Sequence, residues 1–224
     1  MGLRTQADYN DPRSLSARLR ARRLQRFMQM VSECHRRQGG CRVIDVGGTL
    51  GYWAHVPDAF FDQHRCSVTV VNLDPNHTHA PRPYLREHHG DGCALDFADN
   101  AFDIAHSNSV IEHVGDGART QAFADEIRRV APRHYVQTPN YWFPIEPHYL
   151  APGIQFLPYA WQAELLYRIP LGRIDRPQTR TQARAFVEDI RLLTHTELAR
   201  LFPDSTLVGE RLCGLTKSWI AVRQ

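Results

Sequence analysis

The most constraining feature of the chain is an apolar run that ends in a glycine-rich turn, Val43-Ile44-Asp45-Val46-Gly47-Gly48-Thr49-Leu50-Gly51. A short apolar run of this kind is typical of a buried parallel strand, and the glycines after it allow a tight turn into a helix. A nucleotide-like ligand can approach the main chain closely at such a turn. The run therefore predicts an α/β fold with a binding site where this strand ends.

The spacing of the glycines separates two kinds of ligand. A dinucleotide-binding turn has the pattern G-x-G-x-x-G. Here the glycines follow G-G-x-x-G, and Asp45 stands two residues before the first of them. That carboxylate would repel a pyrophosphate, whereas it tolerates a cofactor that has a cationic amino-acid end and no phosphates.

Composition sets broad limits. A chain of 224 residues, 42% hydrophobic and 23% charged, suits one globular domain with a substantial core. The net charge of +3 is too small to argue by itself for a nucleic-acid partner. The cysteines form no C-x-x-C pair, so we expect neither a zinc site nor a disulfide framework, and a cytoplasmic location. No apolar segment predicts a membrane span or a signal peptide.

Strand and helix patterns alternate after the glycine turn. The expected strands are 42–46, 67–73, 84–89, 102–107 and 134–138, and the expected helices are 51–62 and 117–130. This alternation is typical of βαβ units in a parallel sheet. Two further strands, within 205–208 and 217–222, predict a terminal hairpin. The fold class is therefore a Rossmann-like, seven-stranded, mostly parallel sheet with an antiparallel C-terminal hairpin and helices on both faces.

Two segments lie outside this alternation, although we expect residues 1–224 to form a single domain. Residues 1–38 predict an N-terminal helical extension, with a helix over 14–37 that Ser14 caps. Residues 139–180 are rich in proline and aromatic residues and predict an inserted substrate cap. Residues 181–202 predict two more helices, the second capped by Thr194 or Thr196.

Polar residues that follow the later strands support a specific resemblance. Together with the glycine turn they resemble class I S-adenosylmethionine (SAM) dependent methyltransferases, in the small-molecule type 11/23-like branch. The resemblance spans residues 40–138 and implies SAM as cofactor and S-adenosylhomocysteine as product. It implies that Asp74 binds the ribose, Asp91 the adenine amine and Asn108 the methionine end. The full set implied to bind the cofactor is Asp45, Gly47, Gly48, Thr49, Gly51, Asp74, Asp91, Gly92 and Asn108.

Methyl transfer to a hydroxyl requires alignment of the acceptor and removal of its proton. His113 and His148 are the candidate catalytic bases, because both follow strands at the same predicted sheet edge. Glu112-His113 also resembles metal-dependent O-methyltransferases that use Glu-x-x-Glu-His. Ser109 replaces the first glutamate of that motif. We therefore expect no metal at the site and keep as the alternative a divalent ion held by Glu112, His113 and His148, which would lower the pKa of a substrate hydroxyl.

The resemblance implies O-methylation of a small molecule, such as a sugar, glycolipid or secondary metabolite of a bacterial pathway. We expect no stable nucleic-acid partner and leave a homodimer open. One alternative is an RNA methyltransferase that uses the arginine-rich N-terminal helix on phosphates, which predicts salt-sensitive RNA binding. The other is a non-catalytic SAM-binding module.

Overall fold

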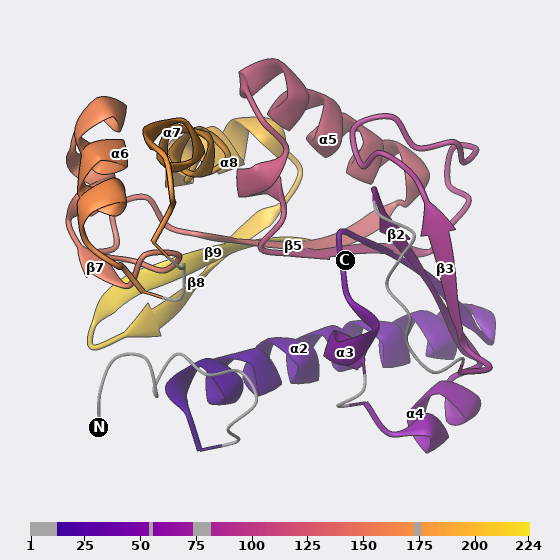
Figure 1. Cartoon of the computed structure of the whole chain (residues 1–224). Helices are drawn as coiled ribbons and strands as arrows, with labels where there is room; N and C mark the ends of the chain where they lie inside the picture. Colours follow the sequence, from indigo (N-terminus) through magenta and orange to yellow (C-terminus); the bar gives the residue numbers. More distant parts are fainter. Residues whose placement is uncertain (1–12, 54–55, 74–81, 173–175) are drawn as a thin grey trace.

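The computed structural model describes residues 13–53, 56–73, 82–172 and 176–224. Its main sheet has seven strands in the order β3-β2-β1-β4-β5-β9-β8 (Figure 1). Strands β1 to β5 pair in parallel, and β9 pairs antiparallel with both β5 and β8. This confirms the predicted fold class. The strand bounds are β1 Cys41–Val46, β2 Cys66–Asn72, β3 Leu85–His89, β4 Ile104–Asn108, β5 Arg133–Pro139, β8 Thr206–Leu212 and β9 Leu215–Arg223.

Helices cover both faces of the sheet (Figure 1). On one face lie α2 (Leu15–Gln38), α3 (Leu50–Trp53) and α4 (Asp58–Gln63), and on the other lie α5 (Gly117–Val130) and α8 (His195–Leu201). Each face has its own apolar core. Phe27, Trp53 and Phe61 belong to the first, and Phe123 and Phe202 belong to the second. The alternation of inward-facing residues on the strands supplies both cores from one sheet.

Local sequence signals explain how α2 begins and ends. The Ser14 hydroxyl accepts a hydrogen bond from the amide of Ala17 at 3.0 Å, as expected for an N-cap. Gly39, with φ of 79°, ends the helix in the left-handed conformation. Buried Phe27 and Val31 on α2 pack into the main core, so α2 forms part of the three-layer fold.

The prediction of one helix over 51–62 is wrong. The structure has two short helices there, α3 and α4, and α4 begins directly after Pro57. Proline has no amide hydrogen and disfavours helical geometry in the residue before it, so a continuous helix cannot run through this position.

The segment expected as a cap consists of short elements that pack on one another. These are β6 (Ile145–Glu146), β7 (Ala151–Pro152), the 3₁₀ turn η2 (Ile154–Phe156) and α6 (Tyr159–Arg168). Helix α7 (Arg180–Glu188) packs beside α6, and a small core joins them through Tyr149, Ile154, Leu166, Ala183 and Val187. The following helix, α8, is capped by Thr194 rather than Thr196, in a capping box with Glu197.

The terminal hairpin forms one edge of the sheet. Cys213 and Gly214 connect β8 to β9 with φ of 51° and 82°, which suits a tight two-residue turn. Inside the hairpin, Glu210 accepts hydrogen bonds from buried Arg23 of α2 at 2.9 and 2.8 Å. The first described helix is thus tied to the last two strands. Within the described ranges, no helix is both long enough and apolar enough to span a membrane.

Candidate functional site

The glycine turn lies between β1 and α3, at the carboxyl ends of the parallel strands. Gly47 has φ of 74°, and its amide donates to the carbonyl of Val71 on β2 at 2.8 Å. The side-chain amide of Asn72 donates to the carbonyl of Gly48 at 2.7 Å. The neighbouring strand therefore holds the turn in place and leaves Thr49 and Gly51 exposed.

Asp45 lies beneath the turn and has no exposed surface. Its two carboxylate oxygens accept hydrogen bonds from Nε1 of Trp53 and Nδ1 of His106, each at 2.7 Å. A Cβ atom on Gly48 would meet Oδ2 of Asp45 at 1.7 Å, so glycine at this position leaves room for the carboxylate. The acid is therefore satisfied inside the protein and supports the turn from below. Its contact with a cofactor stays a prediction.

His106 is a residue that our reading of the sequence missed. It is buried on β4 at the register position opposite Asp45, and its Nε2 lies 3.4 Å from the hydroxyl of Tyr52. The sequence does contain a signal for this residue. It places a histidine within the predicted strand that pairs with the strand of Asp45. A buried histidine of this kind requires a partner, and the buried acid of the neighbouring strand supplies it.

The two later acids of the predicted cofactor site are Asp74 and Asp91. Asp74 lies outside the described residues. Asp91 follows β3 and accepts hydrogen bonds from the amide of Cys93 at 2.9 Å and from Arg119 Nη2 at 3.0 Å on each oxygen. The Cys93 amide and then the Arg119 guanidinium lower the pKa of Asp91, against the opposing effect of burial. Asp91 is therefore ionised and held in a fixed orientation at neutral pH.

Two further features at this edge fit a bound cofactor. Oδ1 of Asn108, at the end of β4, is buried and has no hydrogen-bond partner in the part of the chain that the structure describes. A donor such as an amino group would satisfy it. A Cβ atom on Gly92 would meet Val46 at 2.7 Å and Phe123 at 2.9 Å, so the chain passes close to the sheet here. The residues present are compatible with a cofactor that has an amino-acid end.

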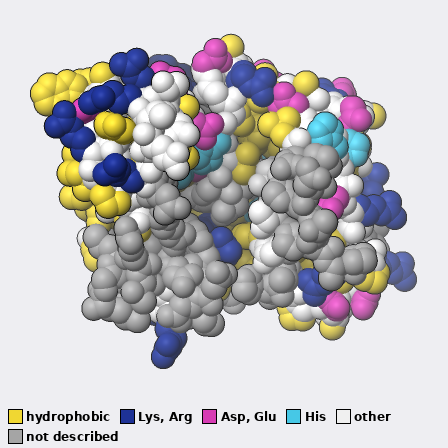
Figure 2. Space-filling view, in the orientation of Figure 1, with side chains coloured by type: hydrophobic (Ala, Val, Ile, Leu, Met, Phe, Trp, Pro, Cys, Tyr) yellow, Lys and Arg dark blue, Asp and Glu magenta, His cyan; other side chains and the backbone are white. Residues whose placement is uncertain are grey.

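A cavity of about 420 Å³ opens beside this region, at the carboxyl ends of β4 and β5. Figure 2 shows histidine and acidic surface together in a recess beside the part of the molecule that carries α6 and α7. Lys217, the single lysine of the chain, faces the cavity, and burial lowers its pKa. The lining residues are Arg23, Ser109, His113, Gln137, Pro139, Pro147, His148, Phe186, Asp189, Ile190, Lys217 and Ser218.

The structure brings the two candidate catalytic histidines together in this cavity. The Nε2 atoms of His113 and His148 lie 3.2 Å apart, with the rings nearly perpendicular at 89°. Each Nδ1 atom is within hydrogen-bond distance of a carboxylate oxygen. Nδ1 of His113 lies 3.2 Å from Oδ2 of Asp189, and Nδ1 of His148 lies 2.6 Å from Oε1 of Glu146. Burial lowers the pKa of His148, but Glu146 and the charges of Glu112 and Asp189 outweigh it, so the net shift is upward.

Glu112 lies behind the histidine pair and is fully buried. Its Oε2 accepts a hydrogen bond from the Thr138 hydroxyl at 2.9 Å, while its Oε1 has no partner among the described residues. Burial raises the pKa of Glu112, and the nearby histidines oppose that shift. One ligand atom each from Glu112, His113 and His148 lies within 4.8 Å of the others.

The aromatic residues of the expected cap do not line the described cavity. Among the described residues of 139–180, Pro139, Pro147 and His148 reach its wall. Tyr149 turns into the small core of that segment, and Trp142 stacks on Phe156 at the surface. The aromatic side chains of the segment therefore do not contribute to this cavity, and their role in an acceptor pocket stays a prediction.

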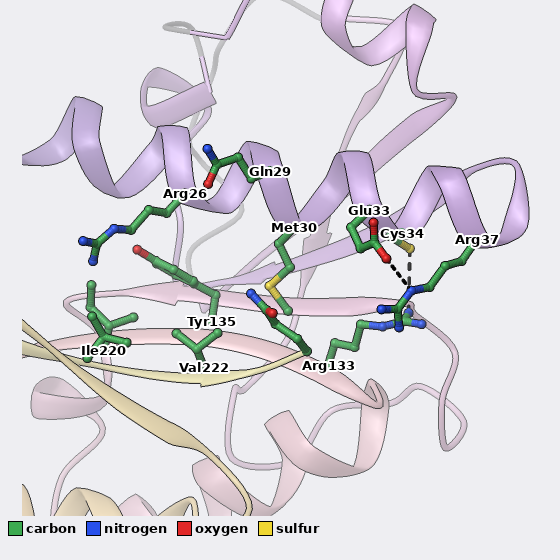
Figure 3. Close-up of a pocket in the computed structure, with 12 residues that line it drawn as sticks. Arg26, Gln29, Met30, Glu33, Cys34, Arg37, Arg133, Tyr135, Ile220 and Val222 are labelled. Carbon is green, nitrogen blue, oxygen red and sulfur yellow. Dashed lines mark hydrogen bonds and ion pairs between the residues drawn. The ribbon is translucent and has the colours of Figure 1, made fainter.

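A second cavity, of about 240 Å³, lies between α2 and the strands β5 and β9 (Figure 3). Arg133 marks the amino end of β5 at this cavity, opposite the edge that carries the glycine turn. In its wall Glu33 pairs with Arg37 at 2.7 Å, and the Arg133 guanidinium donates to the sulfur of Cys34 (Figure 3). It contains none of the predicted site residues.

The arginines of α2 have different surroundings. Arg23 is buried and paired with Glu210 at 2.8 Å. Arg36 and Arg37 pair with Glu33 of the same helix. Arg22 and Arg26 are exposed, so the RNA alternative would have to rest on these rather than on Arg23.

Comparisons with known proteins match a methyltransferase domain in the first two thirds of the chain. Residues 44–133 match the family model described as "Methyltransferase domain". An uncharacterized methyltransferase of Mycolicibacterium vanbaalenii is 35% identical over 98 residues, which cover 42% of this chain and 36% of that protein. A second, from Mycolicibacterium gilvum, is 39% identical over 93 residues, or 39% of this chain and 34% of that protein. The matches thus span about a third of the length of these relatives.

Solved structures share the fold. The PH0226 protein of Pyrococcus horikoshii has a TM-score of 0.53 at 16% identity, covering 96% of this chain and 93% of that one. A SAM-dependent methyltransferase of Methanosarcina mazei has a TM-score of 0.51 at 14% identity, covering 83% and 92%. The family match and the curated relatives identify a methyltransferase domain within the chain, and the solved structures share its fold.

Proposed function

We propose that the chain transfers the methyl group of SAM to a hydroxyl group of a small-molecule acceptor held in the cavity at the ends of β4 and β5. The observation that carries this proposal is the pair His113 and His148, which lines that cavity beside the glycine turn. A volume of about 420 Å³ lies within the range of about 300–1,000 Å³ typical of small-molecule sites.

The cofactor would lie over the turn at the carboxyl ends of the strands. Gly47, Gly48, Thr49 and Gly51 would let its body approach the main chain, and Asn108 would accept a hydrogen bond from its amino group. Asp91 with Gly92 would bind the adenine, and Asp74 the ribose hydroxyls. Asp45 would contribute indirectly, by holding the turn in shape.

The reaction is an in-line displacement. The acceptor oxygen forms a bond to the methyl carbon, the carbon–sulfur bond breaks, and sulfur keeps the electron pair as S-adenosylhomocysteine. A hydroxyl is a weak nucleophile until its proton leaves, so the site must manage that proton. His113 and His148 are the groups in the cavity suited to this task, and the carboxylates behind them fix their orientation.

The size of the cavity and the need for an acceptor hydroxyl together suggest the class of substrate. A sugar, a glycolipid headgroup or a hydroxylated secondary metabolite presents a hydroxyl without requiring a large interface. The partly buried Lys217 in the cavity wall would suit an acceptor that also carries a polar or anionic group.

Two measurements test the proposal in sequence. Calorimetry with SAM and with S-adenosylhomocysteine should show one site per chain; binding of neither would refute the methyltransferase assignment of this site. Release of S-adenosylhomocysteine is then followed with a panel of small alcohols and matched amines. Methylation of the amines and not the alcohols would overturn the oxygen acceptor while leaving SAM dependence intact. Binding of SAM without turnover on any acceptor would favour the non-catalytic module.

A further inference from the structure

The histidine pair has a geometry that two ordinary neighbouring histidines do not explain. Carboxylates accept hydrogen bonds and do not donate them, so the Nδ1 atoms that lie on Asp189 and Glu146 carry the ring protons. In two neutral imidazoles the Nε2 atoms then hold bare lone pairs. These atoms lie only 3.2 Å apart. Two facing lone pairs at that distance repel, so either a proton on one Nε2 atom or a cation bound by both must hold the pair together.

The spacing matches two ligands of one metal ion. Nitrogen atoms each about 2.0–2.1 Å from a shared zinc-like ion would lie 3.2 Å apart when they subtend an angle of about 100° at it. That angle falls between those of octahedral and tetrahedral coordination. Both histidines also have the carboxylate partner on Nδ1 that is usual behind a metal-bound imidazole.

The third ligand is already present. Oε1 of Glu112 is buried without a partner among the described residues. One carboxylate oxygen of Glu112 also belongs to the group of three ligand atoms that lie within 4.8 Å of one another. An unpaired carboxylate oxygen in a fully buried side chain is costly unless a cation satisfies it. Thr138 fixes the other oxygen, so Oε1 is the free one.

We propose that Glu112, His113 and His148 bind one divalent first-row transition-metal ion at the wall of the acceptor cavity. Two imidazoles and one carboxylate favour ions such as Co²⁺, Fe²⁺, Mn²⁺ and Zn²⁺ over Mg²⁺ and Ca²⁺, which prefer oxygen ligands alone. The site reverses the expectation from the sequence that no metal is bound. That expectation rested on the loss of a glutamate at Ser109, whereas Glu146 and Asp189, which orient the two histidines, could not be recognised from the motif.

The role of the ion rests on the proposed function. Three protein ligands leave positions open toward the cavity, which suits a hydroxyl of the acceptor. A divalent ion lowers the pKa of an oxygen that it binds and so favours loss of the proton before methyl transfer. Ser109 and Gln137 share the same wall and would stay outside the ligand set.

The experiment measures Co²⁺ binding by calorimetry and visible absorption, on full-length protein freed of any affinity tag, without SAM or acceptor. The wild-type chain should bind one Co²⁺ ion, and Mg²⁺ should compete poorly. His113→Ala, His148→Ala and the isosteric Glu112→Gln should each weaken binding. Asp189→Asn, an exposed change behind His113, should weaken it by about 10-fold or more, as loss of an outer partner does.

Two controls make the result specific. His88→Ala removes another histidine paired with a carboxylate, at the exposed edge strand β3, and should leave Co²⁺ binding unchanged. The other three-residue cluster among the described residues, Cys34, Cys41 and Asp103, would give the intense sulfur-to-cobalt absorption that a histidine–carboxylate site lacks.

Absence of Co²⁺ and Zn²⁺ binding by the wild-type chain would overturn the inference and show that a proton holds the pair together. Binding that survives His148→Ala and is lost in Cys34→Ser would overturn it as well. Neither outcome touches SAM binding, so failure of the metal site is distinguishable from failure of the proposed function.

Discussion

Asp45 of β1 and His106 of β4 stand opposite each other in the parallel register, and the imidazole donates to the buried carboxylate at 2.7 Å. Trp53 donates to the other oxygen at the same distance. The acid of the glycine motif is thus the centre of a buried hydrogen-bond network. Its first role is to fix the shape of the turn on which the cofactor would lie.

Asp45→Asn should destabilise the fold. The new amide has only one acceptor oxygen, so either Trp53 or His106 is left facing a donor. An unsatisfied buried donor costs about 1–3 kcal/mol. Urea unfolding should therefore show a lower midpoint at unchanged slope. Asp96→Asn, which alters an exposed histidine–carboxylate pair of the same length, serves as the control and should leave the midpoint nearly unchanged. Equal effects of the two substitutions would refute the network.

Gly48→Ala should disturb the turn, whereas Gly51→Ala should not. The added methyl at 48 would overlap Asp45, while at 51 its nearest neighbour is Thr49 Oγ1 at 3.9 Å. Overpacking of this kind costs about 1–3 kcal/mol, and the displaced turn should also weaken SAM binding. Thermal melts and SAM calorimetry on both variants check the prediction. A Gly48→Ala protein with the stability and SAM affinity of Gly51→Ala would contradict it.

His148→Ala should reduce turnover and spare SAM affinity, because the imidazole faces the acceptor cavity rather than the glycine turn. Loss of a group that handles the proton typically costs about 10²–10⁴-fold in rate. The measurement is kcat by release of S-adenosylhomocysteine, together with the Kd of SAM. The control is His195→Ala, an exposed histidine that packs on Trp219. Full activity in His148→Ala would remove this residue from the mechanism.

His134 should make stability fall in mild acid. It is buried on β5, and burial, followed by the charges of Arg223 and Arg128, lowers its pKa to about 4. The unfolded chain takes up a proton below about pH 6.5, while the folded chain resists until about pH 4. Stability is therefore lost as the pH falls through this window, by about 2 kcal/mol at pH 5 relative to pH 7.5.

Unfolding free energies at the two pH values, for wild type and His134→Gln, check this prediction. The variant has no group that titrates at this position, so its stability should fall less steeply with acid. Parallel pH profiles for the two proteins would show that His134 does not contribute.

Glu210→Gln should be strongly destabilising. The Glu210 carboxylate accepts from Arg23 through both oxygens and from the Ser218 hydroxyl at 2.9 Å, all in a buried environment. Removing one member of a buried ion pair leaves the other charge uncompensated and costs about 3–5 kcal/mol. Denaturant unfolding tests this, with Glu33→Gln as the control at an exposed pair on the same helix. Similar midpoints would show that the buried pair contributes little.

The sequence predicts the sheet well because its signals are local. Apolar runs, β-branched residues and glycine turns mark each strand, and the carboxyl ends of parallel strands meet at one edge. This was sufficient to bring His113 and His148 to the same region. Pro57 is also a local signal, because it ends any helix that comes before it, and the prediction of one helix over 51–62 is wrong because it ignores this proline.

The partners of the site residues are not local, and the sequence alone does not reveal them. Asp189 reaches His113 across 76 positions of the chain, and His106 reaches Asp45 across 61. Such pairs depend on how α7 and β4 are placed by packing. The same holds for Tyr149 and Trp142, whose aromatic rings indicated a pocket but pack within the segment or at its surface.

The tie between Arg23 and Glu210 has a practical consequence for expressing this protein in parts. The family match covers only residues 44–133. A fragment cut at those limits would lose α2 from one sheet face and the β8–β9 hairpin from one edge. It would leave Phe61, Val68 and Ile104 without part of the cover that they have in the intact chain. A fragment for expression should therefore keep both Ser14, which caps α2, and the β8–β9 hairpin.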